Sequence, residues 1–427
     1  MKKDKFKYII KEFQEFKFPN IINRELTISE SNKIISLVGN RRSGKTYYFY
    51  QLVKELLSKG IAKDQILYVN FDDDRLYPLK LEELDSLIES YYELFPENKN
   101  KIKYFFLDEI QTIDNWELFV RRLNDKENMS IYLTGSSSKL LSQEIATSLR
   151  GRTLSYYLYT LNFKEFLEFK NFKFTKNDIY SSKRYQLKKL FLEYLNDGSF
   201  PEVVLENNLK KEILNNYFDM FIYKDLVERY SIRNVDLLKK LSLYLLTNIS
   251  NLFSASSYYK SINKEISVSK ETILEYLSYL KEINLVFSVP IYSFSLKQQQ
   301  VNPSKIYTID NGLRNAVSFK FSEDEGRLAE NLVFVELKRK LKEIYYWKGK
   351  GEVDFVIKNK DNSIDLINVC YDNEIPDREV KSINEFIEKH SKAKINNKII
   401  ITKDLEKKET IENKTIKYIP LWKWLLE

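Results

Sequence analysis

The sequence is poor in the residues that build thiol and imidazole sites. Its 427 residues include one cysteine, Cys370, and one histidine, His390. A single cysteine excludes an intramolecular disulfide and a cysteine-rich zinc site. A single histidine excludes HExxH proteases and poly-histidine metal centres. No pattern of Ser-His-Asp catalysis surrounds His390, which we expect on the surface of a helix around residues 380–392.

Long hydrophobic runs are also missing. No apolar run reaches the roughly 18 residues of a transmembrane helix, and the basic start Met1–Lys7 does not lead into the apolar core of a signal peptide. We therefore expect a cytoplasmic protein with no membrane contact. The content of 43% hydrophobic and 30% charged residues is typical of a folded globular chain, and the length predicts several domains. The net charge of +8 is too small to identify an anionic partner by itself.

A glycine-containing loop follows a short apolar run at residues 34–38 and precedes a predicted helix over Tyr47–Ser58. Strand, GxxxxGK[ST] loop and helix in this order predict a phosphate-binding loop for ATP. The residues that we expect to contact the nucleotide are Gly39, Asn40, Arg41, Arg42, Ser43, Gly44, Lys45, Thr46 and Tyr47.

The chemistry of phosphate binding explains these residue types. Gly39 and Gly44 let the backbone N–H groups turn toward phosphate oxygens, and the N-terminus of the helix adds positive potential. Lys45 can reach the β- and γ-phosphates, and the Thr46 hydroxyl can ligate Mg²⁺.

An apolar stretch that ends in two acidic residues supplies the second half of the site. Residues 104–107 are apolar and precede Asp108 and Glu109, about 60 residues after the loop. We expect Asp108 to hold Mg²⁺ through water and Glu109 to polarise the attacking water. The alternative is a strand that enters a solvated loop, but the pairing with the phosphate-binding loop favours a hydrolytic site.

Two polar segments near these elements are further candidates. A predicted strand over Ser130–Leu133 leads to Thr134 and Ser136, either of which can sense the γ-phosphate; the alternative is a polar turn that caps a helix over residues 138–145. Asp73, after a predicted strand over Gln65–Phe71, either lies near the nucleotide or belongs to a solvated turn.

Two arginines precede the predicted strand Leu154–Leu158. Arg150 or Arg152 can present a guanidinium group to the γ-phosphate, from the same chain or from a neighbour in an oligomer. The alternative is a contact with solvent or with an acidic side chain.

These motifs resemble the prokaryotic AAA-type ATPases that carry a winged-helix domain and a restriction-endonuclease-like domain. The resemblance extends over nearly the whole chain and rests on residues 39–46, Leu107-Asp-Glu-Ile-Gln111, Leu133-Thr-Gly-Ser-Ser137, Gly198-Ser-Phe-Pro-Glu-Val-Val204 and Ile419-Pro-Leu-Trp-Lys-Trp-Leu-Leu426. It implies an α/β, doubly wound P-loop core over residues 1–160 and a helical lid over 161–235. It further implies a winged-helix domain over 236–318 and a nuclease-like α/β domain over 319–427.

The middle of the chain has the pattern of elements that a winged helix needs. Helices are expected over 237–251, 257–263 and 269–283, followed by strands over Val286–Ile291 and Lys305–Asp310. The third helix would contact DNA; alternatively the module binds protein. Its candidate DNA contacts are Ser267, Ser269, Lys270, Thr272 and Lys281. Residues 293–303 are expected to form the wing or a mobile loop.

The C-terminal part has an incomplete set of nuclease residues. Metal-dependent nucleases of this type need a helix acid, a strand Asp and an E-x-K pair. Glu330, on a helix over Ser322–Lys340, and Asp354 fill the first two positions, but Asn368 and Cys370 stand where the last acid and the lysine should be. We expect an inactive domain.

The acids of that domain would then be structural ion partners. Glu330, Glu352 and Asp354 would pair with Lys348 or Lys350.

The leading hypothesis is an ATPase that uses Mg²⁺ and ATP as a nucleotide-driven conformational switch, acting on DNA. The alternatives are a nucleotide-gated signalling or scaffold protein that binds protein partners, and an ATP-dependent nuclease. A homo-oligomer is compatible with the sequence.

Overall fold

The computed structural model describes residues 2–29, 31–136, 149–206, 208–318, 325–411 and 414–427. The chain divides into two compact units, a first unit over Met1–Tyr159 and a second unit over Thr160–Glu427. Within the described ranges no helix is long and apolar enough to cross a membrane.

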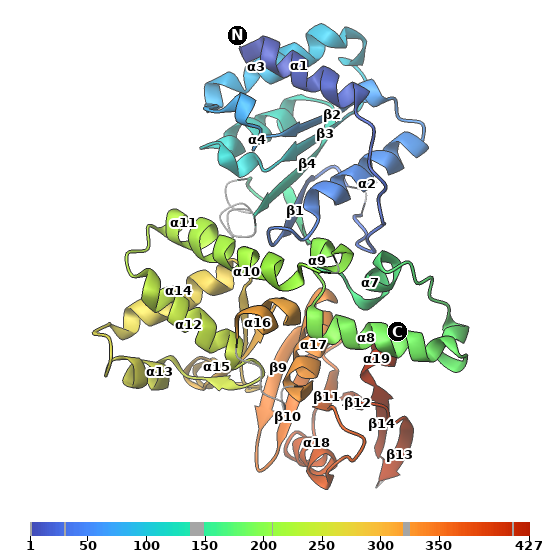
Figure 1. Cartoon of the computed structure of the whole chain (residues 1–427), viewed down its shortest axis with the longest axis vertical. Coiled ribbons are helices and arrows are strands. Elements are labelled where there is room, and N and C mark those ends of the chain that lie inside the picture. Colours follow the sequence, from blue (N-terminus) through green and yellow to red (C-terminus); the bar gives the residue numbers. More distant parts are fainter. Residues whose placement is uncertain (1, 30, 137–148, 207, 319–324, 412–413) are drawn as a thin grey trace. The chain divides into compact units, whose positions relative to one another are not determined.

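The first unit is built on a five-stranded sheet. The strand order is β2-β3-β4-β1-β5, and every neighbouring pair is parallel (Figure 1). The strands are β1 (Ile34–Gly39), β2 (Ile66–Asn70), β3 (Lys103–Asp108), β4 (Met129–Ser136) and β5 (Thr153–Tyr157). Buried apolar residues along β1 and β3 explain why these segments form central strands, since a parallel sheet is covered on both faces.

Helices cover both faces of this sheet. They are α1 (Lys2–Glu15), α2 (Lys45–Ser58), α3 (Asp85–Leu94) and α4 (Trp116–Lys126). One core contains Leu87 of α3 and Phe119 of α4, and a second core contains Phe49 of α2. The doubly wound P-loop core is therefore confirmed. The helix expected over residues 138–145 lies outside the described residues.

Most of the helices among the described residues lie in the second unit. They are α7 (Phe163–Phe169), α8 (Lys183–Asp197), α9 (Pro201–Leu205), α10 (Lys210–Met220), the π-helical segment η7 (Phe221–Val227), α11 (Glu228–Tyr230), α12 (Val235–Thr247), α13 (Ala255–Ile262), α14 (Lys270–Glu282), α15 (Leu296–Val301), α16 (Asn311–Val317), α17 (Glu325–Arg339), α18 (Asp377–Lys389) and α19 (Leu421–Trp424).

Two sheets complete the second unit. A small antiparallel sheet has the order β6-β8-β7, and a mixed six-stranded sheet has the order β13-β14-β12-β11-β10-β9. The small sheet consists of β6 (Leu252–Phe253), β7 (Val286–Val289) and β8 (Ser304–Thr308). The large sheet consists of β9 (Glu343–Lys348), β10 (Glu352–Lys358), β11 (Ile364–Cys370), β12 (Ile395–Thr402), β13 (Lys407–Ile411) and β14 (Lys414–Pro420).

Buried hydrogen bonds connect Ser199, in the helical segment after residue 160, to Asp310 at the start of α16. The Asp310 carboxylate accepts hydrogen bonds from the backbone N–H and the hydroxyl of Ser199, at 2.7 and 3.0 Å, and from the backbone N–H of Leu313 at 2.9 Å. Gly198 has a φ of +82°, and a Cβ atom there would overlap the Asp310 carboxylate. The sequence 198–201 is therefore a structural turn. The finer division of residues 161–427 into three domains stays a prediction.

Residues 293–303 differ from the expected wing or mobile loop. They contain the helix α15, whose first turn is capped by the Ser295 hydroxyl, which accepts the backbone N–H of Gln298. Glutamine has a favourable helix propensity, and a serine N-cap favours the start of a helix at this position.

Candidate nucleotide-binding site

The loop after β1 has the backbone that a phosphate-binding loop requires. Gly44 adopts a left-handed conformation with φ of 96° and directly precedes α2. A Cβ atom on Gly39 would overlap the carbonyl oxygen of Leu158 and would lie 2.8 Å from the Ser43 hydroxyl. Both positions therefore need glycine, for different reasons: one for its dihedral angle and the other for close packing.

The Lys45 side chain is buried against its own loop. Its Nζ donates hydrogen bonds to the carbonyl oxygens of Gly39 and Asn40, at 3.1 and 3.3 Å. The same ammonium lies 3.8 Å from a carboxylate oxygen of Glu109. The predicted phosphate ligand and the predicted water-polarising acid are thus brought together.

Asp108, at the end of β3, is fully buried and accepts three hydroxyl groups. Thr46 Oγ1 and the Tyr68 hydroxyl each donate to Asp108 Oδ2 at 2.8 Å, and the Thr134 hydroxyl donates to Asp108 Oδ1. Burial raises the pKa of the Asp108 carboxyl, as does the charge of Glu109, while the three hydroxyl donors act in the opposite direction.

Glu109 is held in a strained turn directly after β3. Its φ is 54°, in the left-handed region, and its backbone N–H donates to Thr134 Oγ1 at 3.0 Å. The Gln111 side-chain amide donates a hydrogen bond to the Glu109 carboxylate. Thr134 therefore bridges Asp108 and Glu109, and its role as a sensor of the γ-phosphate stays a prediction.

Two residues of this site were missed by the sequence analysis. Tyr68 comes from β2, the strand beside β3, and only the strand order reveals that its hydroxyl reaches Asp108. Arg24 lies in the segment before β1. Its guanidinium group donates to the carbonyl oxygens of Ser43 and Tyr159, at 2.8 and 2.7 Å, and is buried. No local pattern marks either residue.

The remaining predicted residues of the loop lie around this centre. The Asn40 side chain accepts a hydrogen bond from the Tyr157 hydroxyl, and Ser43 is buried. Arg42 has a φ of 66° and lies next to Arg41 in the loop, and Tyr47 is 55% exposed at the start of α2.

The two candidate arginine fingers differ in their surroundings. Arg152 forms a two-pronged ion pair with Asp125 of α4, with distances of 2.8 and 3.1 Å. Arg150 is exposed in a turn, with a φ of 49°. The contact with an acid, the stated alternative, is therefore present for Arg152.

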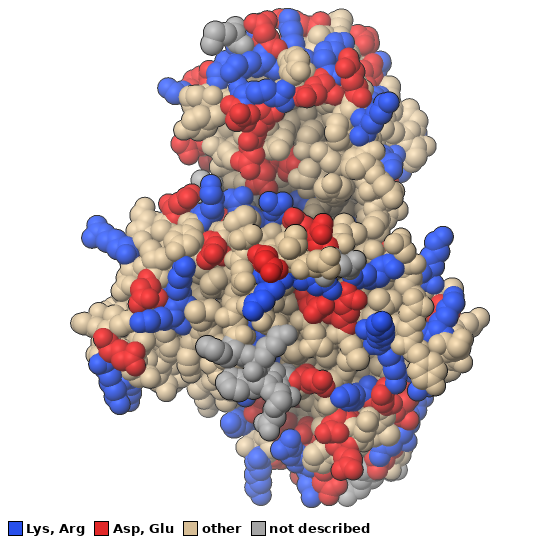
Figure 2. Space-filling view, viewed as in Figure 1, with Lys and Arg blue, Asp and Glu red and all other residues tan. Residues whose placement is uncertain are grey.

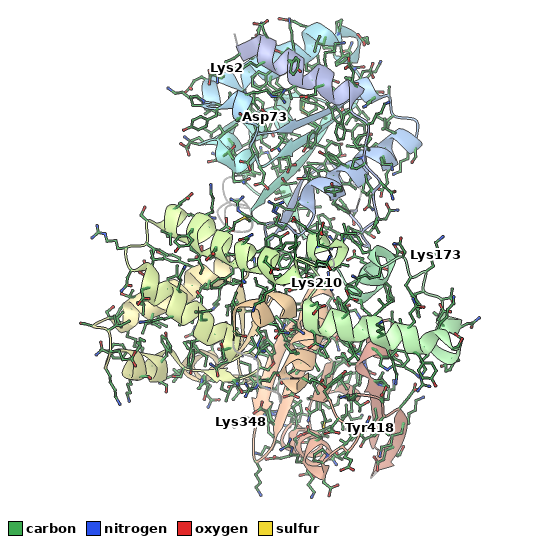
Figure 3. The ribbon with its side chains drawn as sticks, in the orientation of Figure 1. Lys2, Asp73, Lys173, Lys210, Lys348 and Tyr418 are labelled. Atoms are coloured by element: carbon green, nitrogen blue, oxygen red, sulfur yellow. The ribbon has the colours of Figure 1, made fainter. Side chains whose placement is uncertain are left out.

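Two predicted residues remain, Asp73 after β2 and Ser136 in β4. Asp73 accepts the backbone N–H of Arg75 at 3.0 Å and pairs with its guanidinium group (Figure 3 labels Asp73). The side chain of Ser136 lies outside the described part of the structure.

The residues at this edge of the sheet fit a magnesium-bound nucleotide. A hydroxyl and a carboxylate, from Thr46 and Asp108, are already 2.8 Å apart, and these are oxygen ligands of the kind that Mg²⁺ prefers. The buried hydroxyl of Ser43 has no hydrogen-bond partner among the described residues, so it is available to a phosphate oxygen.

A second charged cluster lies in the second unit and corrects a prediction. Glu330, Glu352 and Asp354 do not pair with Lys348 or Lys350. Their partner is Lys305 of β8, whose Nζ lies 3.1, 2.5 and 2.7 Å from the three carboxylates. The prediction was wrong because we expected a lysine close to the acids in the sequence. The lysine that pairs with them comes from β8 of the β6-β8-β7 sheet.

The two residues that interrupt the nuclease pattern have structural partners. Asn368 is buried and donates to the Glu379 carboxylate at 2.9 Å and to the Ser382 hydroxyl at 3.0 Å. Burial raises the pKa of the Cys370 thiol to about 11, so it stays protonated at neutral pH. Over the described ranges no group of three or more histidine, cysteine or acidic residues is arranged to hold a metal ion.

His390 is not a simple surface residue. It ends α18 and is half-buried, and its ring packs against the rings of Tyr292 and Phe386, with centroid distances of 5.3 and 4.5 Å.

Three segments of the chain each match a different protein family. Residues 31–167 match the family described as an AAA domain. Residues 188–324 and 325–424 match two families described as domains of unknown function, DUF8612 and DUF4143. The AAA match covers the loop, Asp108, Glu109 and Thr134, so sequence family and geometry agree that the first unit is an AAA-type P-loop domain.

Two relatives extend over almost the whole chain. The uncharacterized protein MJ1544 of Methanocaldococcus jannaschii is 41% identical over 98% of this chain and 94% of its own length. An uncharacterized protein of Haemophilus influenzae is 31% identical over 94% of this chain and 97% of its own length. The chain belongs to the protein family of these two relatives.

Among solved structures, the similarities are distant. The Walker-type ATPase PABY2304 of Pyrococcus abyssi has a TM-score of 0.41 and 14% identity, over 74% of this chain and 95% of its own. The Orc1 protein of Aeropyrum pernix in complex with DNA has a TM-score of 0.29 and 13% identity, over 74% and 91%. Both TM-scores are low, so neither similarity bears on what this chain binds.

Proposed function

We propose that the first unit binds ATP with Mg²⁺ and hydrolyses it. The observation that carries the proposal is the convergence of Lys45, Thr46, Asp108 and Glu109 at one edge of the parallel sheet, within hydrogen-bond or ion-pair distance of one another. ATP hydrolysis needs this combination of phosphate ligand, metal ligand and general base.

Each residue has a separate task in this proposal. Lys45 leaves its carbonyl partners and neutralises the β- and γ-phosphates, together with the backbone N–H groups of residues 39–46. Thr46 and Asp108 would hold the magnesium ion, which would supply positive charge beside the phosphates. Glu109 accepts a hydrogen bond from the attacking water and orients it toward the γ-phosphorus atom.

Two further groups would respond to the γ-phosphate. Thr134 is hydrogen-bonded to both Asp108 and Glu109, so a shift of either residue changes its contacts. Arg150 is the better candidate for an arginine finger, because Arg152 would first have to leave Asp125.

We further propose that nucleotide binding drives a conformational switch, in which residues 161–235 act as the lid. Arg24 supports a coupling route. It donates to Ser43 in the phosphate-binding loop and to Tyr159, where the chain leaves the first unit. A movement of the loop on ATP binding is therefore transmitted to the residue that precedes the second unit.

The test is steady-state ATP turnover of Lys45→Ala beside Lys59→Ala, an exposed lysine just after the same helix. We expect Lys45→Ala to lose ATP binding and turnover by roughly 100-fold, as expected for an electrostatic phosphate ligand, and Lys59→Ala to match the wild type. Unchanged turnover in Lys45→Ala would sink the proposal.

A second candidate function is a nucleotide-gated scaffold that binds protein. Helix α14, predicted to contact DNA as part of a winged helix, exposes Glu271, Glu275 and Glu282 beside Lys270 and Lys281. This excess of acid disfavours a phosphate backbone. The hydroxyls of Ser269 and Thr272 are 3.1 Å apart, and Ser269 caps α14, so both groups are engaged in the helix start.

The charge distribution on the surface drawn in Figure 2 also disfavours contact with DNA. Figure 2 shows lysine and arginine side chains interspersed with acidic ones, without a broad basic area on that face. A gel-shift series with DNA at increasing salt separates the two partners. Binding near 50 mM salt that weakens steeply as salt is added supports DNA, whereas no binding at about 50 mM supports the scaffold.

A further inference from the structure

The second unit contains one lysine surrounded by three carboxylates. Lys305 Nζ lies 2.7 Å from Asp354 Oδ1, 2.5 Å from Glu352 Oε1 and 3.1 Å from Glu330 Oε1. The lysine side chain is 3% exposed. The lysine comes from β8, while the acids come from α17 and β10, so the cluster joins the small sheet to the large-sheet part of the unit.

Two of the carboxylates accept a second hydrogen bond in addition to that of the lysine. The Val369 backbone N–H donates to Asp354 Oδ2 at 2.8 Å, and the Tyr307 hydroxyl donates to Glu330 Oε1 at 2.6 Å. Oxygens of three carboxylates thus converge on one cation, and Val369 and Tyr307 orient two of these carboxylates.

The charge balance of the cluster requires a cation at its centre. Ionised carboxylates in a buried place are costly without a cation beside them, and the Lys305 ammonium supplies that positive charge. Burial alone would lower the pKa of Lys305, but Asp354, Glu330 and Glu352 raise it well above its ordinary value.

We infer that the Lys305 ammonium is the resident cation of this cluster and takes the place that a divalent metal ion would occupy between Glu330 and Asp354. The cluster therefore binds no metal in the native chain. Truncation of Lys305 converts the same three carboxylates into a divalent-cation site. This inference does not depend on the proposed ATPase.

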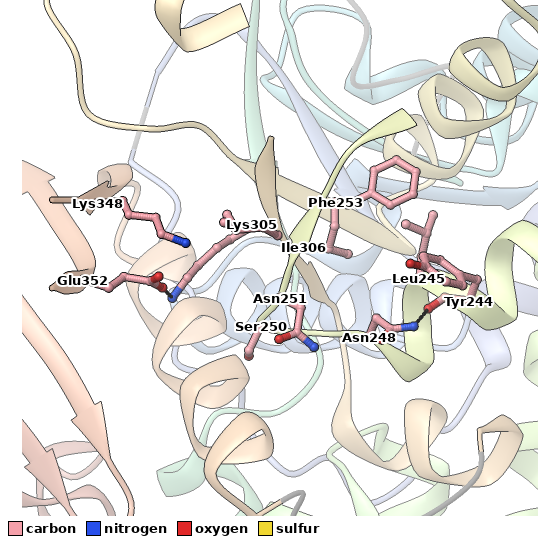
Figure 4. Close-up of a pocket in the computed structure, with 11 residues that line it drawn as sticks. Tyr244, Leu245, Asn248, Ser250, Asn251, Phe253, Lys305, Ile306, Lys348 and Glu352 are labelled. Atoms are coloured by element: carbon pink, nitrogen blue, oxygen red, sulfur yellow. Dashed lines mark hydrogen bonds and ion pairs between the residues drawn. The ribbon is translucent and has the colours of Figure 1, made fainter. Parts of the chain in front are cut away.

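An entry route for a cation is present. A pocket of about 390 Å³ is bordered by Lys305, Lys348 and Glu352 on one side and by Asn248 and Asn251 on the other (Figure 4). The figure shows the Lys305 and Glu352 side chains meeting at the edge of the pocket. A hydrated ion in the pocket would reach the carboxylates once the lysine head group is removed.

The experiment counts bound Mn²⁺ by electron paramagnetic resonance in the nucleotide-free full-length chain. Mn²⁺ prefers carboxylate oxygens and reports directly on binding. We expect Lys305→Ala to bind one more Mn²⁺ per chain than the wild type, and the double variant Lys305→Ala/Glu330→Gln to lose that additional ion. Any ion at Thr46 and Asp108 is common to all three proteins and cancels in the comparison.

Thermal unfolding gives an independent readout. Millimolar Mn²⁺ should raise the melting temperature of Lys305→Ala by about 5 °C, because it binds only the folded state, and leave the wild type unchanged. A Lys305→Ala chain that folds but takes up no additional Mn²⁺ overturns the inference.

A second comparison covers the case in which Lys305→Ala does not fold. Glu330→Gln keeps the lysine and an amide oxygen that can accept its hydrogen bond. An equal count of bound Mn²⁺ in Glu330→Gln and the wild type supports the inference. A wild type that binds an ion which Glu330→Gln loses contradicts it, because that ion would share the cluster with the ammonium.

Discussion

The side-chain amide of Gln111 donates a hydrogen bond to the carboxylate of Glu109. Glu109 is followed immediately by a short 3₁₀ turn over Ile110–Thr112, so the two side chains leave one tight segment of backbone. One Glu109 oxygen faces Gln111, and the other lies 3.8 Å from the Lys45 ammonium. Two neighbours thus fix the orientation of the carboxylate that we propose to polarise water.

Gln111→Ala should slow hydrolysis without much effect on ATP affinity. Loss of a hydrogen bond to a charged group costs about 1.5–3 kcal/mol. If about half of that orients Glu109 in the transition state, kcat falls roughly tenfold. Steady-state kinetics should show this fall with KM for ATP changed by less than about twofold. A kcat equal to that of the wild type would mean that Gln111 does not position Glu109.

Arg24→Lys should weaken the connection between the phosphate-binding loop and the end of the first unit. Lysine has a single ammonium and cannot reproduce the planar fork that reaches both Ser43 and Tyr159. One buried carbonyl left without its donor costs about 1–3 kcal/mol. We expect a lower melting temperature and weaker binding of a fluorescent ATP analogue.

Arg75→Lys is the matched control for that change. Arg75 forms its ion pairs with Asp73 and Glu12 at 40% exposure, where such pairs contribute about 0–1 kcal/mol. Equal losses of melting temperature and of analogue binding in both variants would show that Arg24 contributes nothing beyond its positive charge.

Glu330→Gln should change how stability depends on pH. Burial, with the charge of Asp354, raises the pKa of Glu330 to about 7, although Lys305 and the Tyr307 hydroxyl act in the opposite direction. An acid whose pKa is higher in the folded state contributes stability that is fully present below its unfolded pKa, near 4.3, and lost as pH rises through its folded pKa. The wild type should therefore lose stability relative to Glu330→Gln between about pH 4.5 and 7.

Urea unfolding at several pH values measures this difference. The remaining titratable groups of the cluster, Glu352, Asp354, Lys305 and Tyr307, are the same in both proteins, so they largely cancel. A free-energy difference that stays constant across this range, or that moves in favour of the wild type, contradicts the expectation.

Gly198→Ala should destabilise the second unit through contact as well as backbone strain. Its φ is +82°, and an added Cβ would overlap the Asp310 carboxylate. Gly60 has a similar φ of +86° with nothing within 4 Å of its Cβ position, so Gly60→Ala reports strain alone, about 1 kcal/mol. Chemical denaturation should show Gly198→Ala to be worse by roughly 2 kcal/mol or more. Equal destabilisation in the two variants would show that the contact with Asp310 adds nothing to the effect of backbone strain.

Most residues that meet at the candidate nucleotide site could be named from the sequence because their signals are local. Gly39 to Thr46 form one continuous segment, and Asp108 and Glu109 end an apolar strand, so strand and loop chemistry identify them without any knowledge of the fold. Thr134 follows from the same argument on β4. Tyr68 and Arg24 could not be found in this way, because the strand order β2-β3 and the course of the segment before β1 bring them in.

In the second unit, too, contacts between residues far apart in the sequence could not be predicted. Glu330 and Asp354 were recognised from their elements, but their partner Lys305 is 25 and 49 positions away along the chain. A lysine in an alternating strand pattern is normally exposed, and only the packing of β8 against α17 and β10 makes Lys305 a buried cation. The roles predicted for Arg150 and Arg152 remain predictions, as does the contact of α14 with DNA.

The central claim is that the edge of the sheet around Lys45 and Glu109 hydrolyses ATP. The most direct test is a comparison of Glu109→Gln with the wild type, in which Mg²⁺-dependent ATP binding and steady-state phosphate release are measured on the same preparations. We expect ATP affinity within about threefold of the wild type and turnover lower by roughly 100-fold or more, because only the water-polarising carboxylate is lost. Phosphate release at the wild-type rate in Glu109→Gln would contradict it.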